Sequence, residues 1–183
     1  LQPTVLLLPT ALFNVIAAVQ PDAFRGVQWL QFAGEKANQK AVERVMYASA
    51  PRFIQNLYGP TECTVFCTCY DITASDMQRT IPIPIGRAVP QALLYVVDPH
   101  MRLVPIGVPG ELLIGGTGVA IGYVNQPDLT RERFIINPFG DGRVYKSGDI
   151  VRWIEIEEQE NDTRIELEYS HRRDTQVKVR GHR

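Results

Sequence analysis

Residues 53–62 read Phe-Ile-Gln-Asn-Leu-Tyr-Gly-Pro-Thr-Glu, a strand that runs into a sharp turn. The largely apolar residues at 53–57 predict the strand. Gly59-Pro60 then ends it, because proline has no N–H for a sheet ladder and glycine tolerates the backbone angles of tight turns. Thr61 and Glu62 are thereby placed at the tip of a turn that follows a strand.

Each residue of this turn has a chemical use. The absence of a Cβ at Gly59 lets a ligand approach the backbone, and the ring of Tyr58 can cover one face of a planar base. The Thr61 hydroxyl and nearby backbone amides can donate to phosphate oxygens, and the Glu62 carboxylate suits a hard cation such as Mg²⁺. Together these groups suggest a nucleotide with a metal, although a turn of this kind, taken alone, is more often an ordinary loop corner.

Upstream of the turn, short apolar runs alternate with helical patterns. Strands are predicted at Thr4–Leu8, Val27–Phe32 and Phe53–Leu57. Thr10 can cap a helix that is predicted to bury one apolar stripe, formed by Leu12, Val15, Ile16 and Val19. Asn38 opens a second helix, whose predicted buried stripe consists of Ala41, Val42, Val45 and Met46. The order strand, helix, strand, helix, strand predicts an α/β fold with parallel pairing and helical cover. It also places Tyr58 at the carboxyl end of a strand, where open α/β sheets bind ligands.

Downstream of Tyr70 the pattern changes to short strands between Gly and Pro corners. They are expected at Ile81–Ile85, Leu93–Val97, Glu111–Ile114 and Val144–Lys146, and a hairpin with an acidic tip is expected over residues 153–169. We therefore predict a parallel α/β portion over residues 1–70 and a mostly antiparallel, barrel-like β portion over 71–183. Both are expected to be parts of one larger domain.

Composition narrows the class of protein. The 183 residues are 45% hydrophobic, enough for a core, and 19 basic and 20 acidic residues give a formal charge of −1. A nearly neutral chain has no overall electrostatic field that would attract nucleic acid or an anionic membrane.

The apolar amino end, interrupted by Pro3 and Pro9, is interpreted as core rather than a leader. Three cysteines without framework spacing, Cys63, Cys67 and Cys69, favour small buried side chains and a reducing cytoplasm.

Four motifs occur in one order along the chain. They are Tyr-Gly-Pro-Thr-Glu at 58–62, Gly-Glu-Leu-Leu-Ile-Gly-Gly at 110–116 with Gly122-Tyr123, Tyr-Lys-Ser-Gly-Asp at 145–149, and Arg-Asp-Thr-Gln-Val-Lys-Val-Arg-Gly at 173–181. This series closely resembles the adenylation domains of nonribosomal peptide synthetases, which belong to the acyl- and aminoacyl-adenylate-forming enzymes. The resemblance covers nearly the whole chain.

The resemblance implies roles for individual residues. In the turn, Asn56 would contact the adenine amino group, Tyr58 would stack on adenine, Thr61 would bind the α-phosphate and Glu62 would help to hold Mg²⁺. Thr61 and Glu62 are thus the catalytic candidates, and the ribose would be held by Asp149, with Arg172 reaching it. The nucleotide-binding set is completed by Gly34 and Gly59.

Two segments need separate comment. Before the hinge the family usually has Leu-Gly-Arg, whereas this chain has Ser170-His171-Arg172, so the backbone at His171 must tolerate a side chain. The hinge aspartate itself corresponds to Asp174. Gly115-Gly116-Thr117-Gly118 lacks the lysine of a Walker motif and the spacing of a dinucleotide fingerprint, and we interpret it as structural.

The acyl pocket of the family corresponds to a mostly apolar set with one amide. Its members are Leu7, Gln31, Ala33, Leu57, Val65 and Phe66. The set favours a hydrophobic or medium-sized substrate side chain. The aspartate that holds a substrate amino group would precede Leu1, so an amino, keto or hydroxy acid is equally compatible with these residues.

As part of a whole domain, the chain would act as an ATP-dependent ligase. It would activate an acid with Mg-ATP as the acyl adenylate and pass it to a carrier-protein phosphopantetheine thiol. Expected partners are the C-terminal adenylation subdomain, the carrier protein and a condensation domain. The family's triphosphate loop and C-terminal lysine have no counterpart in these residues, so the chain alone is expected to be inactive. The alternatives are a noncatalytic scaffold within a synthetase and a related acyl-CoA ligase.

Overall fold

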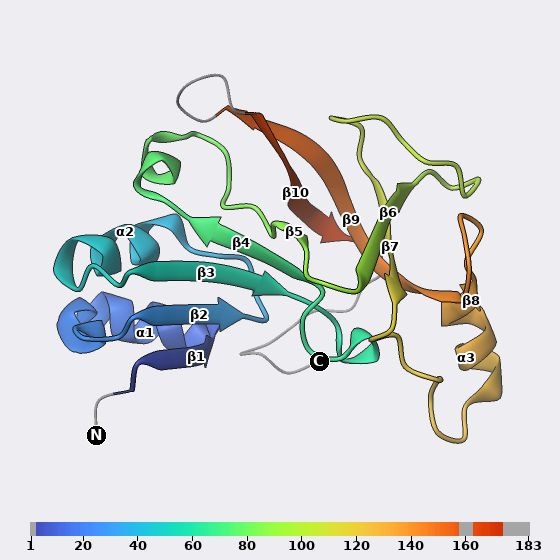
Figure 1. Cartoon of the computed structure of the whole chain (residues 1–183), viewed down its shortest axis with the longest axis horizontal. Helices are drawn as coiled ribbons and strands as arrows, with labels where there is room; N and C mark the ends of the chain where they lie inside the picture. The colour runs from blue at the N-terminus through green and yellow to red at the C-terminus, as the bar shows by residue number, and fades with distance from the viewer. Residues whose placement is uncertain (1–2, 158–162, 174–183) are drawn as a thin grey trace.

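The computed structural model describes residues 3–157 and 163–173, which form two five-stranded sheets (Figure 1). The first sheet has the order β1-β2-β3-β4-β5. Its strands are β1 (Val5–Pro9), β2 (Trp29–Ala33), β3 (Phe53–Tyr58), β4 (Thr68–Ile72) and β5 (Arg87–Ala88). The pairs β1-β2 and β2-β3 are parallel, and β4 and β5 are antiparallel additions. The predicted parallel α/β portion is therefore confirmed.

Two helices cover one face of this sheet, α1 (Thr10–Val19) and α2 (Gln39–Ala48), with a 3-10 turn η1 (Pro21–Phe24) between them. The Asn38 side chain caps α2 by accepting from the amide of Ala41 at 3.2 Å, as its sequence predicts. The predicted apolar stripe of α2 is also confirmed, with Met46 partly buried at its edge.

The predicted stripe of α1 is wrong for three of its four residues. Leu12, Val15 and Val19 are exposed, whereas Phe13 and Ala17 are buried and the Phe13 ring stacks on Phe32 of β2 at 4.4 Å. The Thr10 hydroxyl does not cap the helix but donates to the carbonyl of Glu35.

The second sheet is antiparallel and has the order β10-β9-β7-β6, with β8 also paired to β9. Its strands are β6 (Ala92–Val97), β7 (Gly110–Gly116), β8 (Phe134–Ile136), β9 (Arg143–Glu157) and β10 (Thr163–Arg172), and helix α3 (Pro127–Arg133) precedes β8. The antiparallel prediction is confirmed, although the sheet is an open path rather than a closed barrel. Strands β9 and β10 form the predicted hairpin, whose tip at 158–162 lies outside the described residues.

The segment Ile81–Ile85 is not a strand, contrary to the sequence-based expectation. Pro82 and Pro84 lack the N–H groups that a ladder needs, so the segment is irregular although Ile83 and Ile85 are buried. At its end, the amide of Ile85 donates to the carbonyl of Leu167 in β10 at 2.8 Å. This segment therefore ties the first sheet to the second.

A shared core holds the second sheet against the loop that follows β3. Two 3-10 turns, η2 (Thr61–Cys63) and η3 (Ala74–Gln78), flank β4. The core includes Cys63 and Cys67 beside that loop, and Leu112 and Leu167 from the second sheet. The fold thus places β7, β9 and β10 next to the Tyr58 turn. No helix in the described ranges is long and apolar enough to cross a membrane.

Candidate functional site

The loop after Tyr58 folds back onto the end of β3. Thr64 and Val65 have positive φ angles of 58° and 68°, and the amide of Cys67 donates to the carbonyl of Tyr58 at 2.9 Å. A Cβ built at Gly59 would lie 2.5 Å from the carbonyl oxygen of Val65 and 2.7 Å from the Cα of Phe66. Glycine is therefore required at 59 for the loop to close. The close approach of a ligand to the backbone at Gly59 remains a prediction.

The second sheet brings Asp149 to Tyr58. The Tyr58 hydroxyl donates to Oδ2 of the buried Asp149 carboxylate at 2.5 Å, and the Arg172 guanidinium donates to Oδ1 at 3.1 Å. Burial, followed by the charge of Asp149, raises the pKa of Tyr58 well above its usual value, so this phenol remains a donor at neutral pH. The carboxylate is thus held on both oxygens.

A β-bulge in β10 sets the position of Arg172. The pairing with β9 shifts between Tyr169 and His171, and after the shift Arg172 lies opposite Asp149. The backbone at His171 is outside the positive-φ region and the side chain is exposed, so histidine is tolerated where the family usually has glycine. Asp174, the predicted hinge residue, lies outside the described residues.

Glu62 is buried beside the same turn. Its Oε1 accepts from the Tyr123 hydroxyl at 2.8 Å, and its backbone carbonyl accepts from the amide of Ala120 at 2.8 Å. Neighbouring Thr61 is exposed. The described residues contain no group of three or more His, Cys, Asp or Glu side chains that could hold a metal ion. Any cation at Glu62 would thus take most of its ligands from substrate and water, which is how proteins commonly bind Mg²⁺.

Asn56 is buried on the helix-covered face of the first sheet. Its side-chain nitrogen donates to the carbonyl of Pro84 at 2.7 Å, so this donor is used within the protein. Gly34 follows β2 with a φ of +106° and has open space where a Cβ would stand.

Four predicted acyl-pocket residues share the face of the first sheet opposite the helices. Leu7 pairs with Gln31, and Ala33 with Leu57, so all four point to the same side of adjacent strands. The Gln31 amide donates to Gln55 at 2.7 Å. The remaining two, Val65 and Phe66, lie in the loop after β3 and are exposed and half-buried.

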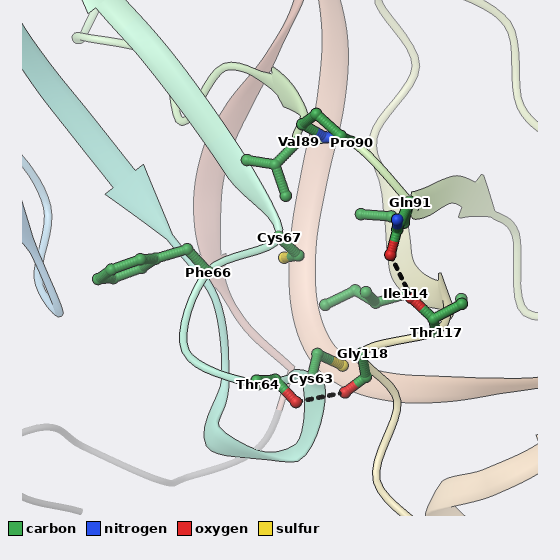
Figure 2. A pocket seen from close by; sticks show the side chains of 12 residues that line it. Cys63, Thr64, Phe66, Cys67, Val89, Pro90, Gln91, Ile114, Thr117 and Gly118 are labelled. Carbon is green, nitrogen blue, oxygen red and sulfur yellow. Dashed lines mark hydrogen bonds between the residues drawn. The ribbon is translucent and has the colours of Figure 1, made fainter.

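A cavity of about 340 Å³ lies next to this loop (Figure 2). It is lined by residues of three segments: Cys63, Thr64, Phe66 and Cys67; Val89–Ala92; and Ile114, Gly115, Thr117 and Gly118. The cavity shares only Phe66 with the predicted acyl pocket. All three cysteines are free, and burial raises the pKa of the Cys63 thiol to about 12, which makes it unreactive at neutral pH.

Residues 1–124 match the model of the AMP-binding enzymes. The chain belongs to this family. It is 41% identical over 183 residues to gramicidin S synthase 2 of Brevibacillus brevis, covering 100% of this chain and 4% of that protein. It is also 41% identical to aldehyde reductase lnaA of Aspergillus flavus, over 98% of this chain and 17% of that protein. The chain thus spans a small part of the relatives it matches.

The fold of this AMP-binding chain is similar to a solved structure of holo-PA1221, an NRPS protein containing adenylation and PCP domains. The TM-score is 0.87 at 30% identity, over 98% of this chain and 30% of that one. The resemblance to adenylation domains inferred from the four motifs is confirmed.

One residue that contacts this candidate site has no role assigned by the motifs. Tyr123 lies in one of the four motifs, and its hydroxyl contacts the Glu62 carboxylate and lies 3.4 Å from the hydroxyl of Tyr145. The signal available was its place in the ordered motif series. Its partner Glu62 lies 61 positions upstream, so the contact between them is seen only in the folded structure.

Proposed function

We propose that this chain is part of an adenylation domain. The domain activates a carboxylic acid with Mg-ATP as an acyl adenylate and transfers the acyl group to a carrier-protein phosphopantetheine thiol in nonribosomal peptide synthesis. The observation that carries the proposal is the contact of Tyr58, Asp149 and Arg172, in a chain of the AMP-binding family.

The nucleoside would bind at this contact. Asp149 has a carboxylate fixed on both oxygens, which suits the pair of ribose hydroxyls, and the half-buried Tyr58 ring suits a purine face. The Asn56 nitrogen donates to Pro84, which orients the amide and leaves its carbonyl end as the acceptor for an adenine amino group. Specificity for adenine would come from Asn56 and Tyr58 together.

Glu62 would hold Mg²⁺, together with phosphate oxygens and water. A single buried carboxylate next to an expected phosphate site fits a cation that keeps most of its own water. When bound, the ion would neutralise negative charge on the phosphates. The Thr61 hydroxyl, exposed at the start of η2, would donate to an α-phosphate oxygen.

The reaction requires no nucleophile from the protein. The substrate carboxylate attacks the α-phosphorus of ATP, a new C–O–P bond forms, and the bond to pyrophosphate breaks. The carrier thiol then attacks the acyl carbon and AMP leaves. The residues of this chain would act by positioning both reactants and by stabilising charge on the phosphate. Leu7, Gln31, Ala33, Leu57, Val65 and Phe66 would receive the acyl side chain.

The carrier partner is supported by the PCP domain named in the PA1221 structure. The condensation domain, the C-terminal subdomain that turns at Asp174 and the cytoplasmic location remain parts of the proposal. So does the choice among amino, keto and hydroxy acids.

The test is ATP–pyrophosphate exchange by the full-length protein against a panel of amino, keto and hydroxy acids. Asp149→Ala is compared with Asp22→Ala, which removes an exposed carboxylate from η1, distant from the site along the chain and in the fold. We expect exchange with one acid class, a loss of about 100-fold or more in Asp149→Ala because a ribose-binding carboxylate is removed, and no loss in the control.

The acyl acceptor is tested in the same preparation, with the phosphopantetheinylated carrier protein and free coenzyme A offered separately. Loading of the carrier supports the peptide-synthetase assignment, and loading of coenzyme A alone would replace it with an acyl-CoA ligase. Absence of exchange with every acid would favour the scaffold.

A further inference from the structure

We propose that Tyr123 is a positioning residue that holds the Glu62 carboxylate where a divalent cation is bound with ATP. This inference rests on the proposed function and assigns a role to the segment that joins β7 to α3. The Tyr123 hydroxyl donates to Glu62 Oε1 at 2.8 Å, although the two residues are 61 positions apart.

The segment around residues 116–123 is fastened to the Tyr58 loop at three points. The Ala120 amide donates to the Glu62 carbonyl at 2.8 Å, and the Thr64 hydroxyl donates to the Gly118 carbonyl at 2.8 Å. The Tyr123–Glu62 contact is the third. Figure 2 shows the Thr64–Gly118 contact at the edge of the cavity. Backbone and side chain of Glu62 are thus both held by this one segment.

The Tyr123 ring is itself fixed from the opposite side. It packs edge-on against Phe134 of β8, with centroids 5.3 Å apart and an interplanar angle of 68°. The Tyr123 amide donates to the Thr130 hydroxyl of α3 at 2.9 Å. A Cβ at Gly122 would lie 2.4 Å from Thr130 Cγ2, so only glycine permits this close approach to α3. The hydroxyl therefore projects toward Glu62 from a rigid support.

A phenol is suited to this task because it is neutral. The ordinary pKa of a phenol is about 10, so a tyrosine hydroxyl is protonated at neutral pH and can donate a hydrogen bond. A neutral donor orients a carboxylate without cancelling its charge, whereas a positively charged arginine would cancel it. Glu62 then keeps the negative charge that attracts a cation.

The experiment measures Mn²⁺ binding to the full-length protein with ATP by electron paramagnetic resonance, without acid substrate so that no turnover occurs. Tyr123→Phe removes only the hydroxyl and keeps the ring on Phe134. Glu62→Gln removes the charge. Tyr95→Phe is the matched control, because it also removes one phenol contact, to Asn137 at 3.3 Å, away from Glu62.

We expect Tyr123→Phe to weaken Mn²⁺ binding about tenfold, the size of a lost hydrogen bond to a charged group, and Glu62→Gln to weaken it at least as much. ATP affinity in EDTA should be unchanged in Tyr123→Phe, which a general structural defect would not allow. Tyr95→Phe should match the wild type in both measurements.

Two different failures are distinguishable. If Glu62→Gln weakens Mn²⁺ binding and Tyr123→Phe does not, the role of Tyr123 is overturned while the proposed function stands. If the wild type binds neither ATP nor Mn²⁺ with ATP, the proposed function fails and the role of Tyr123 falls with it. A loss of ATP affinity in EDTA equal to the loss for Mn²⁺ would make Tyr123 merely structural.

Discussion

At the scale of single residues, the thiol of Cys69 is expected to make the stability of the fold depend on pH. Cys69 is half-buried on β4, and burial, followed by the charge of Asp71, raises the pKa of its thiol from the ordinary value of 9.0 to about 11. The unfolded chain therefore loses this proton first as pH rises. The stabilising contribution is fully present below about pH 9 and is lost as pH rises through about 11.

Replacing Cys69 with alanine should make stability less sensitive to alkali. Urea unfolding at a series of pH values is the measurement. We expect the wild type to lose on the order of 1 kcal/mol more than Cys69→Ala between pH 8 and 11, after allowance for partial exposure of the thiol. Parallel curves for the two proteins over this range would contradict the assignment.

The sequence predicts most residues of the candidate site but not how they are joined. Tyr58 and Asp149 were both predicted to bind nucleotide, yet their hydrogen bond spans 91 positions and depends on how the second sheet packs. Local pattern carries no information on such a contact. The same holds for Tyr123 and Glu62, which are brought together by contacts between the segment after β7 and the loop after β3.

At the scale of elements, the loop after β3 depends on close backbone packing. Gly59→Ala would place a methyl group 2.5 Å from the Val65 carbonyl oxygen, and the obstruction is backbone that must move as a whole. We expect the free energy of unfolding to fall by about 1–3 kcal/mol, the usual cost of overpacking.

Urea unfolding at neutral pH checks this value, with Gly140→Ala as the matched control. At Gly140 the nearest atom to a new Cβ is the Asn137 side-chain nitrogen at 3.6 Å, an ordinary contact, so a change within about 0.5 kcal/mol is expected. Equal effects of the two substitutions would mean that the loop can move without cost.

Element predictions succeeded where the pattern had one solution. In α2 polar residues mark the exposed face, and Ala41, Val42 and Val45 are buried as predicted. In α1 only Thr10 and Asn14 are polar, so periodicity could not distinguish the stripe of Leu12 from that of Phe13. The contact with Phe32 decided between them.

At the scale of the whole molecule, the described fold supplies only some of the groups that the proposed reaction needs. The chain corresponds to 30% of the PA1221 chain and exposes apolar residues such as Leu7 and Trp29 on the face opposite the helices. We expect the 183-residue chain, produced alone, to show no acid-dependent ATP–pyrophosphate exchange under conditions in which the full-length protein is active. Robust exchange by the chain alone would show that these residues suffice.

The bulge in β10 bears on how such proteins are recombined. Ser170 is the additional residue between Tyr169 and His171, and if it were paired in the ladder instead of bulged out, His171 rather than Arg172 would stand opposite Asp149. A chimera joined between β9 and the end of β10 must therefore keep the bulge as well as the motifs. A parent that has the same number of residues here but no bulge would contribute an arginine that faces away from the carboxylate, even if every motif were retained.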